Sequence, residues 1–168
     1  MKIRSYLPDS DFDEIKTWLS DARSHALWCA NLMPYPLEKT TFENTLKKLA
    51  TKSEDKPFAV ITEEGKLIGF FCYSINSGTK EGKLKFVILS PAFRGKGYGK
   101  KMVLSALKYA FENTKVASVE LNVFDNNVQA KNCYLKVGFK VRSSTENAFR
   151  FNNENWTRCN MVINDIKR

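Results

Sequence analysis

Three glycines stand close together in the segment Arg94–Lys100, between an apolar stretch and an amphipathic one. Glycine permits backbone dihedrals that other residues avoid, and it lets a ligand approach without meeting a Cβ atom. Free N–H groups at the start of a helix attract anions, and the helix dipole adds to this attraction. The segment therefore predicts a pyrophosphate site, which is surrounded by the positive charges of Arg94, Lys96, Lys100 and Lys101.

The spacing of these glycines limits which pyrophosphate-containing ligands the segment could bind. A Walker A loop needs Lys-Ser/Thr after its last glycine, and Gly99-Lys100-Lys101 lacks the hydroxyl residue. A dinucleotide fingerprint counted from Gly95 would need glycine or alanine at Lys100. The remaining pattern, Arg-x-x-Gly-x-Gly, resembles the signature of the GNAT family of N-acetyltransferases, whose turn holds the pyrophosphate of coenzyme A. A glycine-rich helix cap without a ligand is the alternative.

A second segment resembles the closing motif of the same family. Leu121–Asn127 ends a predicted strand, Ala130 follows on a helix, and Cys133–Phe139 contains Tyr-x-x-x-Gly-Phe. The resemblance covers about Phe86–Phe139 closely and the rest of the chain through the order of its strands and helices. It implies an enzyme that transfers the acetyl group of acetyl-CoA to a primary amine of a small molecule or a peptide, by direct attack in a ternary complex.

The resemblance also assigns residues to the donor. In the family, the pantetheine arm lies along the strand before the glycine turn, and one N–H group near Ile88 or Leu89 would face the thioester oxygen. Asn127 either contacts this arm or caps the predicted helix 128–137 that follows it. The implied cofactor-binding residues are Val87, Ile88, Leu89, Arg94, Gly95, Lys96, Gly97, Tyr98, Gly99, Lys100, Asn127 and Tyr134.

Amide formation from a thioester requires a neutral amine and a proton for the leaving thiolate. Tyr134 matches the tyrosine that serves many family members as general acid. A phenol with a pKa of about 10 can protonate a thiolate whose conjugate acid has a pKa of about 8.5. Packing of Tyr134 on the sheet is the alternative.

The general base is less well defined. Some members of the family carry glutamate where this chain has Asn122, and an amide cannot accept a proton at neutral pH. Glu120 lies two positions away, on the same side of the predicted strand, and could act directly or through a water. An exposed strand carboxylate is the alternative for Glu120. Glu81 and His25 are weaker candidates, and deprotonation through ordered water is equally open.

The segment 21–37 has the composition of a wall for the acceptor pocket. It reads as a loop, but it is unusually aromatic and apolar. Trp28 and Tyr35 could line an amine channel and attract a cation through their rings, or they could be buried against the sheet. His25, the only histidine, could titrate near neutrality, although a surface or capping role is the alternative.

The elements that must position these residues follow from hydrophobic periodicity. Their order predicts a mixed α/β (α+β) fold, and the resemblance implies a GNAT-like, mostly antiparallel central sheet of about six or seven strands with helices on both faces. Expected strands are 2–6, 58–62, 67–73, 83–89, 118–124, 139–143 and 156–163. Expected helices begin near Asp9 or Ser10, near Thr40 or Thr41, after the glycine turn, and at 128–137.

Length and composition indicate one globular domain over 1–168, because 43% of residues are hydrophobic and 12% aromatic. We expect a cytoplasmic protein, since no apolar run reaches the roughly 18 residues of a membrane helix and the N-terminus lacks a signal-peptide pattern. The four cysteines are scattered, which predicts reduced and mostly buried thiols and no metal site.

A net charge of +9 suits a polyphosphate cofactor, but it also suits nucleic acid. A basic nucleic-acid-binding module is therefore an alternative, although the aromatic residues do not form a recognisable stacking platform. A non-catalytic sensor of coenzyme A is another. We expect a small-molecule or peptide amine as partner, no nucleic acid, no membrane and, from the resemblance, a possible homodimer.

Overall fold

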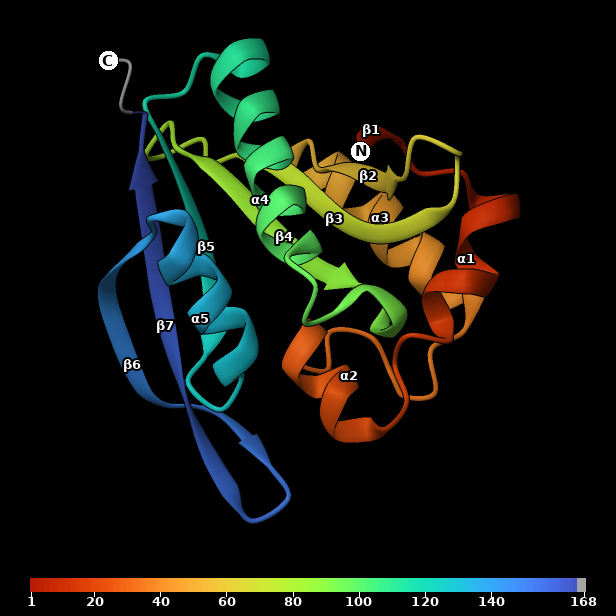
Figure 1. Cartoon of the computed structure of the whole chain (residues 1–168). Helices are drawn as coiled ribbons and strands as arrows, with labels where there is room; N and C mark the ends of the chain where they lie inside the picture. The colour runs from red at the N-terminus through yellow and green to blue at the C-terminus, as the bar shows by residue number, and fades with distance from the viewer. Residues whose placement is uncertain (166–168) are drawn as a thin grey trace.

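The computed structural model describes residues 1–165, so the last three residues of the predicted 1–168 domain lie outside the described part. Its centre is a seven-stranded sheet with the order β1-β2-β3-β4-β5-β7-β6. All neighbouring strands are antiparallel except β4 and β5 (Figure 1). The prediction of a mixed, mostly antiparallel sheet is confirmed. The strands are β1 (Lys2–Ser5), β2 (Lys56–Ile61), β3 (Leu67–Ile75), β4 (Gly82–Leu89), β5 (Ser118–Phe124), β6 (Lys140–Phe151) and β7 (Glu154–Asn164).

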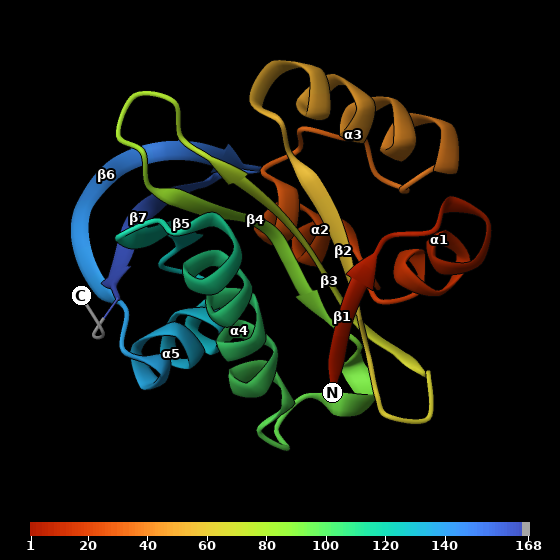
Figure 2. The ribbon, with the colours of Figure 1, turned by 90° about the horizontal axis from the view of Figure 1, so that it is seen from above.

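Helices cover both faces of this sheet, as Figure 2 shows from above. One face carries α1 (Pro8–Lys16), α2 (Ala22–Cys29) and α3 (Lys39–Ser53). The other carries α4 (Tyr98–Tyr109), which continues as a π-helical turn over Ala110–Thr114, and α5 (Val128–Val137). A 3-10 turn, Pro91–Phe93, joins β4 to the segment before α4.

Each face has its own hydrophobic core. Apolar residues of α4, among them Met102 and Leu107, pack with Val119 and Leu121 of β5 on one side of the sheet. Phe42 of α3 packs with other aromatic and aliphatic residues on the opposite side. Burial of one such side chain contributes about 1.5–3 kcal/mol. The sheet is thus held between two independent layers of helices, which fixes its strands relative to one another.

The segment 21–37 differs from the prediction, because part of it forms the helix α2. The Asp21 carboxylate begins this helix by accepting the Ser24 N–H group at 2.7 Å, and Ala30 ends it in the left-handed conformation with φ 51°. Ala26 and Cys29 are buried on its inner face. The expectation of a loop was wrong, because eight residues give too short a periodic pattern to stand out and packing against the sheet stabilises the helix.

The last two strands are longer than predicted. They form a hairpin in which β6 extends to Phe151 and β7 begins at Glu154. Phe149 and Phe151 pack around Trp156 with ring centroids 5.4 and 5.1 Å away. These contacts lie across the two strands, so they extend the ladder beyond what either strand alone would indicate.

The neighbouring strands β4 and β5 are paired over only a short stretch. The parallel pairing of β4 with β5 includes only Gly82, Lys83 and Leu84 of β4. Beyond Leu84 the two strands diverge (Figure 1). One extra residue is accommodated in β4 opposite β3 near Phe86, whose φ of 51° marks a β-bulge. Within residues 1–165, no helix is both long and apolar enough to cross a membrane.

Candidate active site

The glycine segment begins where β4 ends. Gly95 and Gly97 have φ values of 74° and 80°, and Gly97 directly precedes α4. A Cβ atom at either position would meet no atom within 4 Å, so the space beside this backbone is open. The first N–H groups of a helix have no partner within the helix. The segment thus presents unpaired donors to an open space, and it fits a pyrophosphate group.

The basic residues of this segment differ in what their side chains contact. Arg94 and Lys96 donate to backbone carbonyl groups, whereas Lys100 is exposed. Arg94 donates from Nε to the Leu89 carbonyl oxygen at 3.1 Å, and burial lowers the pKa of its guanidinium. Lys96 donates to the Ala92 carbonyl oxygen at 3.0 Å. These bonds hold the loop against the end of β4. Lys100 has an exposed side chain on the first turn of α4, where its charge adds to the helix dipole.

The edge of β4 beyond Leu84 has no neighbouring strand on the side of β5. Val87 and Leu89 pack toward the core under α4, whereas Ile88 is buried in the core on the other face. Their opposite edge is paired with β3, through Leu89 with Gly69 and Ile88 with Phe70. An unpaired strand edge offers a row of N–H and C=O groups to any extended amide chain. This edge leads directly into the glycine segment, so a pantetheine arm and its pyrophosphate fit one continuous surface.

Tyr134 lies on α5, on the same face of the sheet as α4. Its side chain is buried, and burial raises the pKa of the phenol. Among residues 1–165, no hydrogen-bond partner of its hydroxyl is found, while its ring packs on Phe139 at 5.9 Å. A phenol in this setting stays protonated at neutral pH and has a proton to donate.

Asn127 precedes α5 and caps it, since its Oδ1 atom accepts the Ala130 N–H group at 3.3 Å. Capping, which was one of its two predicted roles, is therefore present. Gly99 of α4 lies close to α5, because a Cβ atom there would be 3.4 Å from the Cys133 sulfur. The close approach of α4 and α5 sets the distance between the glycine segment and Tyr134.

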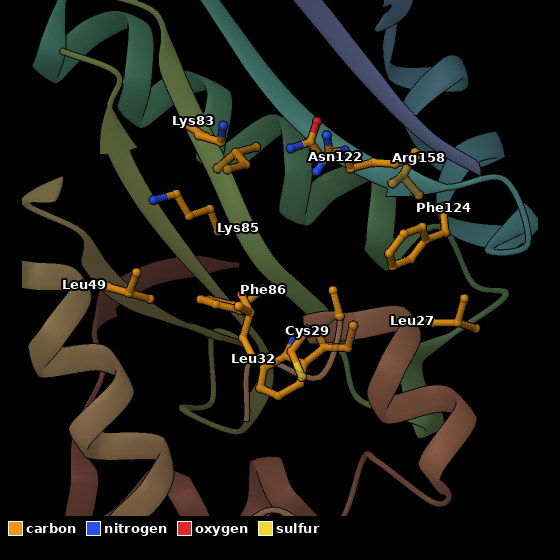
Figure 3. A pocket seen from close by; sticks show the side chains of 14 residues that line it. Leu27, Cys29, Leu32, Leu49, Lys83, Lys85, Phe86, Asn122, Phe124 and Arg158 are labelled. Atoms are coloured by element: carbon orange, nitrogen blue, oxygen red, sulfur yellow. The ribbon is translucent and has the colours of Figure 1, made fainter. Parts of the chain in front are cut away.

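A pocket of about 390 Å³ lies on the other face, where β4 and β5 diverge (Figure 3). Phe86 of β4 and Phe124 of β5 line it from two sides, and α2 with the residues after it closes a third. Leu84 and Val123 line this pocket and also belong to the core cluster that contains Tyr134, so the pocket lies against the gap between the diverging strands. The lining residues are Leu27, Trp28, Cys29, Ala30, Leu32, Leu49, Lys83, Leu84, Lys85, Phe86, Asn122, Val123, Phe124 and Arg158.

Glu120 is buried, not exposed, and it belongs to a network of polar side chains. Lys83 pairs with its Oε1 atom at 3.0 Å, and the Arg142 guanidinium pairs with its Oε2 atom. Asn160 donates at 3.0 Å both to Glu120 and to Asn122, so the predicted shared face of these two residues is observed. Burial raises the pKa of Glu120, but these hydrogen bonds and the charge of Lys83 outweigh it and leave the pKa below its ordinary value. The carboxylate is therefore a weak proton acceptor.

Glu81 and His25, the two weaker candidates for the general base, also interact closely with neighbouring side chains. Glu81 accepts two hydrogen bonds from Arg142, at 2.8 and 2.9 Å. His25 is fully buried, which excludes the surface position offered as its alternative, and burial lowers the pKa of its imidazole. Its ring packs against Tyr35 at 5.5 Å and Trp28 at 6.1 Å.

Of the three residues predicted on the acceptor side, only Trp28 lines the pocket. Tyr35 is exposed, with its hydroxyl 3.5 Å from the Ser20 carbonyl oxygen, and His25 lies behind the pocket wall. His25 packs on both rings and does not line the pocket.

Arg158, Lys83 and Lys85 line the pocket, although the sequence did not single them out. Alternation along the predicted strand 156–163 places Arg158 on one face with Trp156 and Asn160. Which face meets the pocket depends on the register of β7 against β5, and that register is a tertiary feature. Among residues 1–165, no group of three or more His, Cys, Asp or Glu is placed to hold a metal ion, and the four cysteines are unpaired.

Known proteins resemble this chain in sequence and in fold. A spermine/spermidine N(1)-acetyltransferase of Bacillus subtilis is 30% identical over 89 residues, which are 49% of this chain and 59% of that protein. An uncharacterized N-acetyltransferase of Archaeoglobus fulgidus is 37% identical over 89 residues, with the same shares of each chain. The match thus spans 59% of the length of either relative.

A spermidine N-acetyltransferase from Vibrio cholerae, solved in complex with CoA and spermine, has the same fold. Its TM-score is 0.80 at 22% identity, over 97% of this chain and 94% of that one. The sequence model of the acetyltransferase (GNAT) family matches residues 8–139, well over half of the chain. The protein therefore belongs to the acetyltransferase (GNAT) family.

Proposed function

We propose that this protein is an enzyme that transfers the acetyl group of acetyl-CoA to a primary amine of a small molecule or a peptide. The observation that carries this assignment is the unpaired edge of β4 that leads into the open glycine segment before α4. A cofactor with an extended amide arm and a pyrophosphate matches both parts in the order in which the chain presents them.

The donor is held mainly by backbone groups. Those of Val87, Ile88 and Leu89 pair with the arm as an added strand would, and the N–H groups around Gly97 and Gly99 bind the phosphates. Lys100 and the helix dipole add positive charge. Acetyl-CoA itself supplies a thioester, whose carbonyl carbon accepts the attacking amine.

Transfer then needs two proton movements. The amine nitrogen bonds to the carbonyl carbon, an N–H group near Ile88 or Leu89 stabilises the oxyanion, and the carbon–sulfur bond breaks. Tyr134 donates its proton to the leaving sulfur, since burial keeps its phenol protonated. The amine loses its own proton to water, because the ion pairs of Glu120 leave that carboxylate little basicity.

Polyamines are candidate acceptors, since the Bacillus subtilis relative is named for spermine and spermidine. We also propose that the protein is cytoplasmic and forms a homodimer.

The test is release of free thiol from acetyl-CoA in the presence of a panel of amines, together with thermal stabilisation by acetyl-CoA alone. Binding to the folded state should stabilise the protein by about 2.7 kcal/mol at a hundredfold excess over the dissociation constant. Absence of both signals would contradict the assignment. Stabilisation without turnover on any amine would favour the sensor, and steeply salt-dependent binding to generic DNA would favour the nucleic-acid module.

A further inference from the structure

We propose that the acceptor is a primary amine that also carries a carboxylate and an apolar group, and that Arg158 binds this carboxylate. The inference rests on the proposed acetyl transfer and names the substrate class of that site. It follows from two features of the pocket, namely a guanidinium without an ion-pair partner in 1–165 and a lining that is otherwise mostly apolar.

The charged residues of the pocket all have the same sign. None of the fourteen lining residues, all within the described 1–165, is Asp or Glu, whereas Lys83, Lys85 and Arg158 are cationic. Two of these charges are already neutralised. Lys85 donates to both oxygens of buried Asp55 at 2.8 and 3.0 Å, and Lys83 pairs with Glu120 at 3.0 Å.

Arg158 is the exception, because its guanidinium has no ion pair or hydrogen bond with any residue in 1–165. It is exposed on β7 opposite Phe124 of β5, and in Figure 3 it lies next to Asn122 at the rim of the pocket. A guanidinium offers parallel N–H donors that match the two oxygens of a carboxylate. One carboxylate balances the single positive charge that the protein leaves unpaired here.

The rest of the lining is apolar. Figure 3 shows Leu27, Leu32 and Phe86 below the polar rim, with Phe124 to one side. A hydrophobic side chain next to the carboxylate would remove this surface from water. An apolar α-amino acid has these groups together with a primary amine. A polyamine brings several positive charges into a pocket whose lining has one unpaired cation and no carboxylate, which disfavours polyamines among the candidate acceptors.

The test compares leucine, leucinamide, spermidine and O-phosphoethanolamine as acceptors at saturating acetyl-CoA, with thiol release as the readout. Leucinamide has the shape of leucine without its negative charge, and its amine loses a proton more readily. A preference for leucine therefore cannot come from easier deprotonation of its amine. We expect kcat/KM to be roughly tenfold to a hundredfold higher for leucine than for leucinamide, as for loss of one charged hydrogen bond.

Arg158→Gln should lower kcat/KM for leucine by a similar factor, mainly through KM, and leave leucinamide unchanged. Arg150→Gln is the matched control, because Arg150 lies on β6 and does not line the pocket. It should alter neither acceptor. In the presence of coenzyme A, leucine should also raise the melting temperature of the wild type but not of the Arg158→Gln variant.

Several results would overturn the inference while acetyl transfer stands. These are a preference for spermidine or O-phosphoethanolamine, equal use of leucine and leucinamide, or an Arg158→Gln variant as active on leucine as the wild type. If acetyl-CoA binds but no amine reacts, absence of stabilisation by leucine would equally overturn it. Failure of acetyl-CoA to bind at all would instead refute the proposed function.

Discussion

The two halves of the proposed site, one for the acetyl donor and one for the acceptor, are built in different ways. The donor half consists of the β4 edge and the glycine segment, and it presents mostly backbone groups from one continuous stretch, 87–100. The acceptor half is a pocket of side chains from α2, α3, β4, β5 and β7. A cofactor that is the same throughout a family can be held by backbone geometry, whereas a variable acceptor is selected by side chains that change without disturbing the fold.

This comparison predicts that changes in the two halves separate donor binding, chemistry and acceptor binding. The largest effect is expected from Tyr134→Phe, because it removes the proton of the general acid. We expect kcat to fall roughly a hundredfold to ten-thousandfold, with the dissociation constant of acetyl-CoA nearly unchanged. Stopped-flow or steady-state thiol release measures the first, and thermal shift the second. Tyr109→Phe, at the C-terminal end of α4 where its ring packs against the core, is the matched control, and equal loss in both variants would remove the acid role.

The next effect is expected from Gly97→Val, which acts on the donor half alone. The φ of 80° strains any residue with a Cβ atom, by roughly 1–2 kcal/mol. We expect a lower free energy of unfolding and weaker binding of acetyl-CoA, measured by urea unfolding and isothermal titration. KM for the acceptor should hold. Gly78→Ala, in a loop whose glycine has no positive φ, should change neither quantity.

Glu120→Gln tests the polar network that Glu120 forms with Lys83, Arg142 and Asn160. We expect kcat to change less than tenfold, since its ion pairs make the carboxylate a weak base, and the free energy of unfolding to fall by about 1 kcal/mol at neutral pH. A large loss of kcat with intact stability would restore Glu120 as the base.

The loss in the free energy of unfolding caused by Glu120→Gln should depend on pH. The pKa of Glu120 in the folded protein is below its ordinary value, so its contribution to stability is present above that ordinary value and disappears as the pH falls through the folded pKa. The difference between wild type and variant should thus be largest near neutrality and vanish in acid. Urea unfolding across the acidic range measures it.

The smallest effect is expected from Asp21→Ala, which removes the cap of α2. We expect a loss of about 0.5–1 kcal/mol in the free energy of unfolding. Because α2 walls the pocket, KM for the acceptor should rise slightly while acetyl-CoA binding is unchanged. Glu38→Ala is the control, because Glu38 precedes α3 in the same way but its side chain makes no capping hydrogen bond. An equal effect on both ligands would mean that the two halves are not independent.

The donor half could be predicted from the sequence because its determinants are local. Positive φ values favour glycine at positions 95 and 97, and strand, turn and helix follow each other within the single stretch 82–109. Periodicity likewise indicated all seven strands and every helix except α2. Helix α2 escaped because its eight residues are stabilised by one cap and by packing on other elements, not by a pattern of their own.

The acceptor half was decided by the tertiary structure. Arg158, Phe124 and Trp28 are far apart in the chain, and only the divergence of β4 from β5 and the register of β7 bring them to one pocket. The same register made Glu120, a candidate base for which an exposed carboxylate was the alternative, a buried partner of Lys83 and Arg142. Local spacing specifies backbone conformation, but which side chains face each other across strands depends on pairings that a single sequence does not reveal.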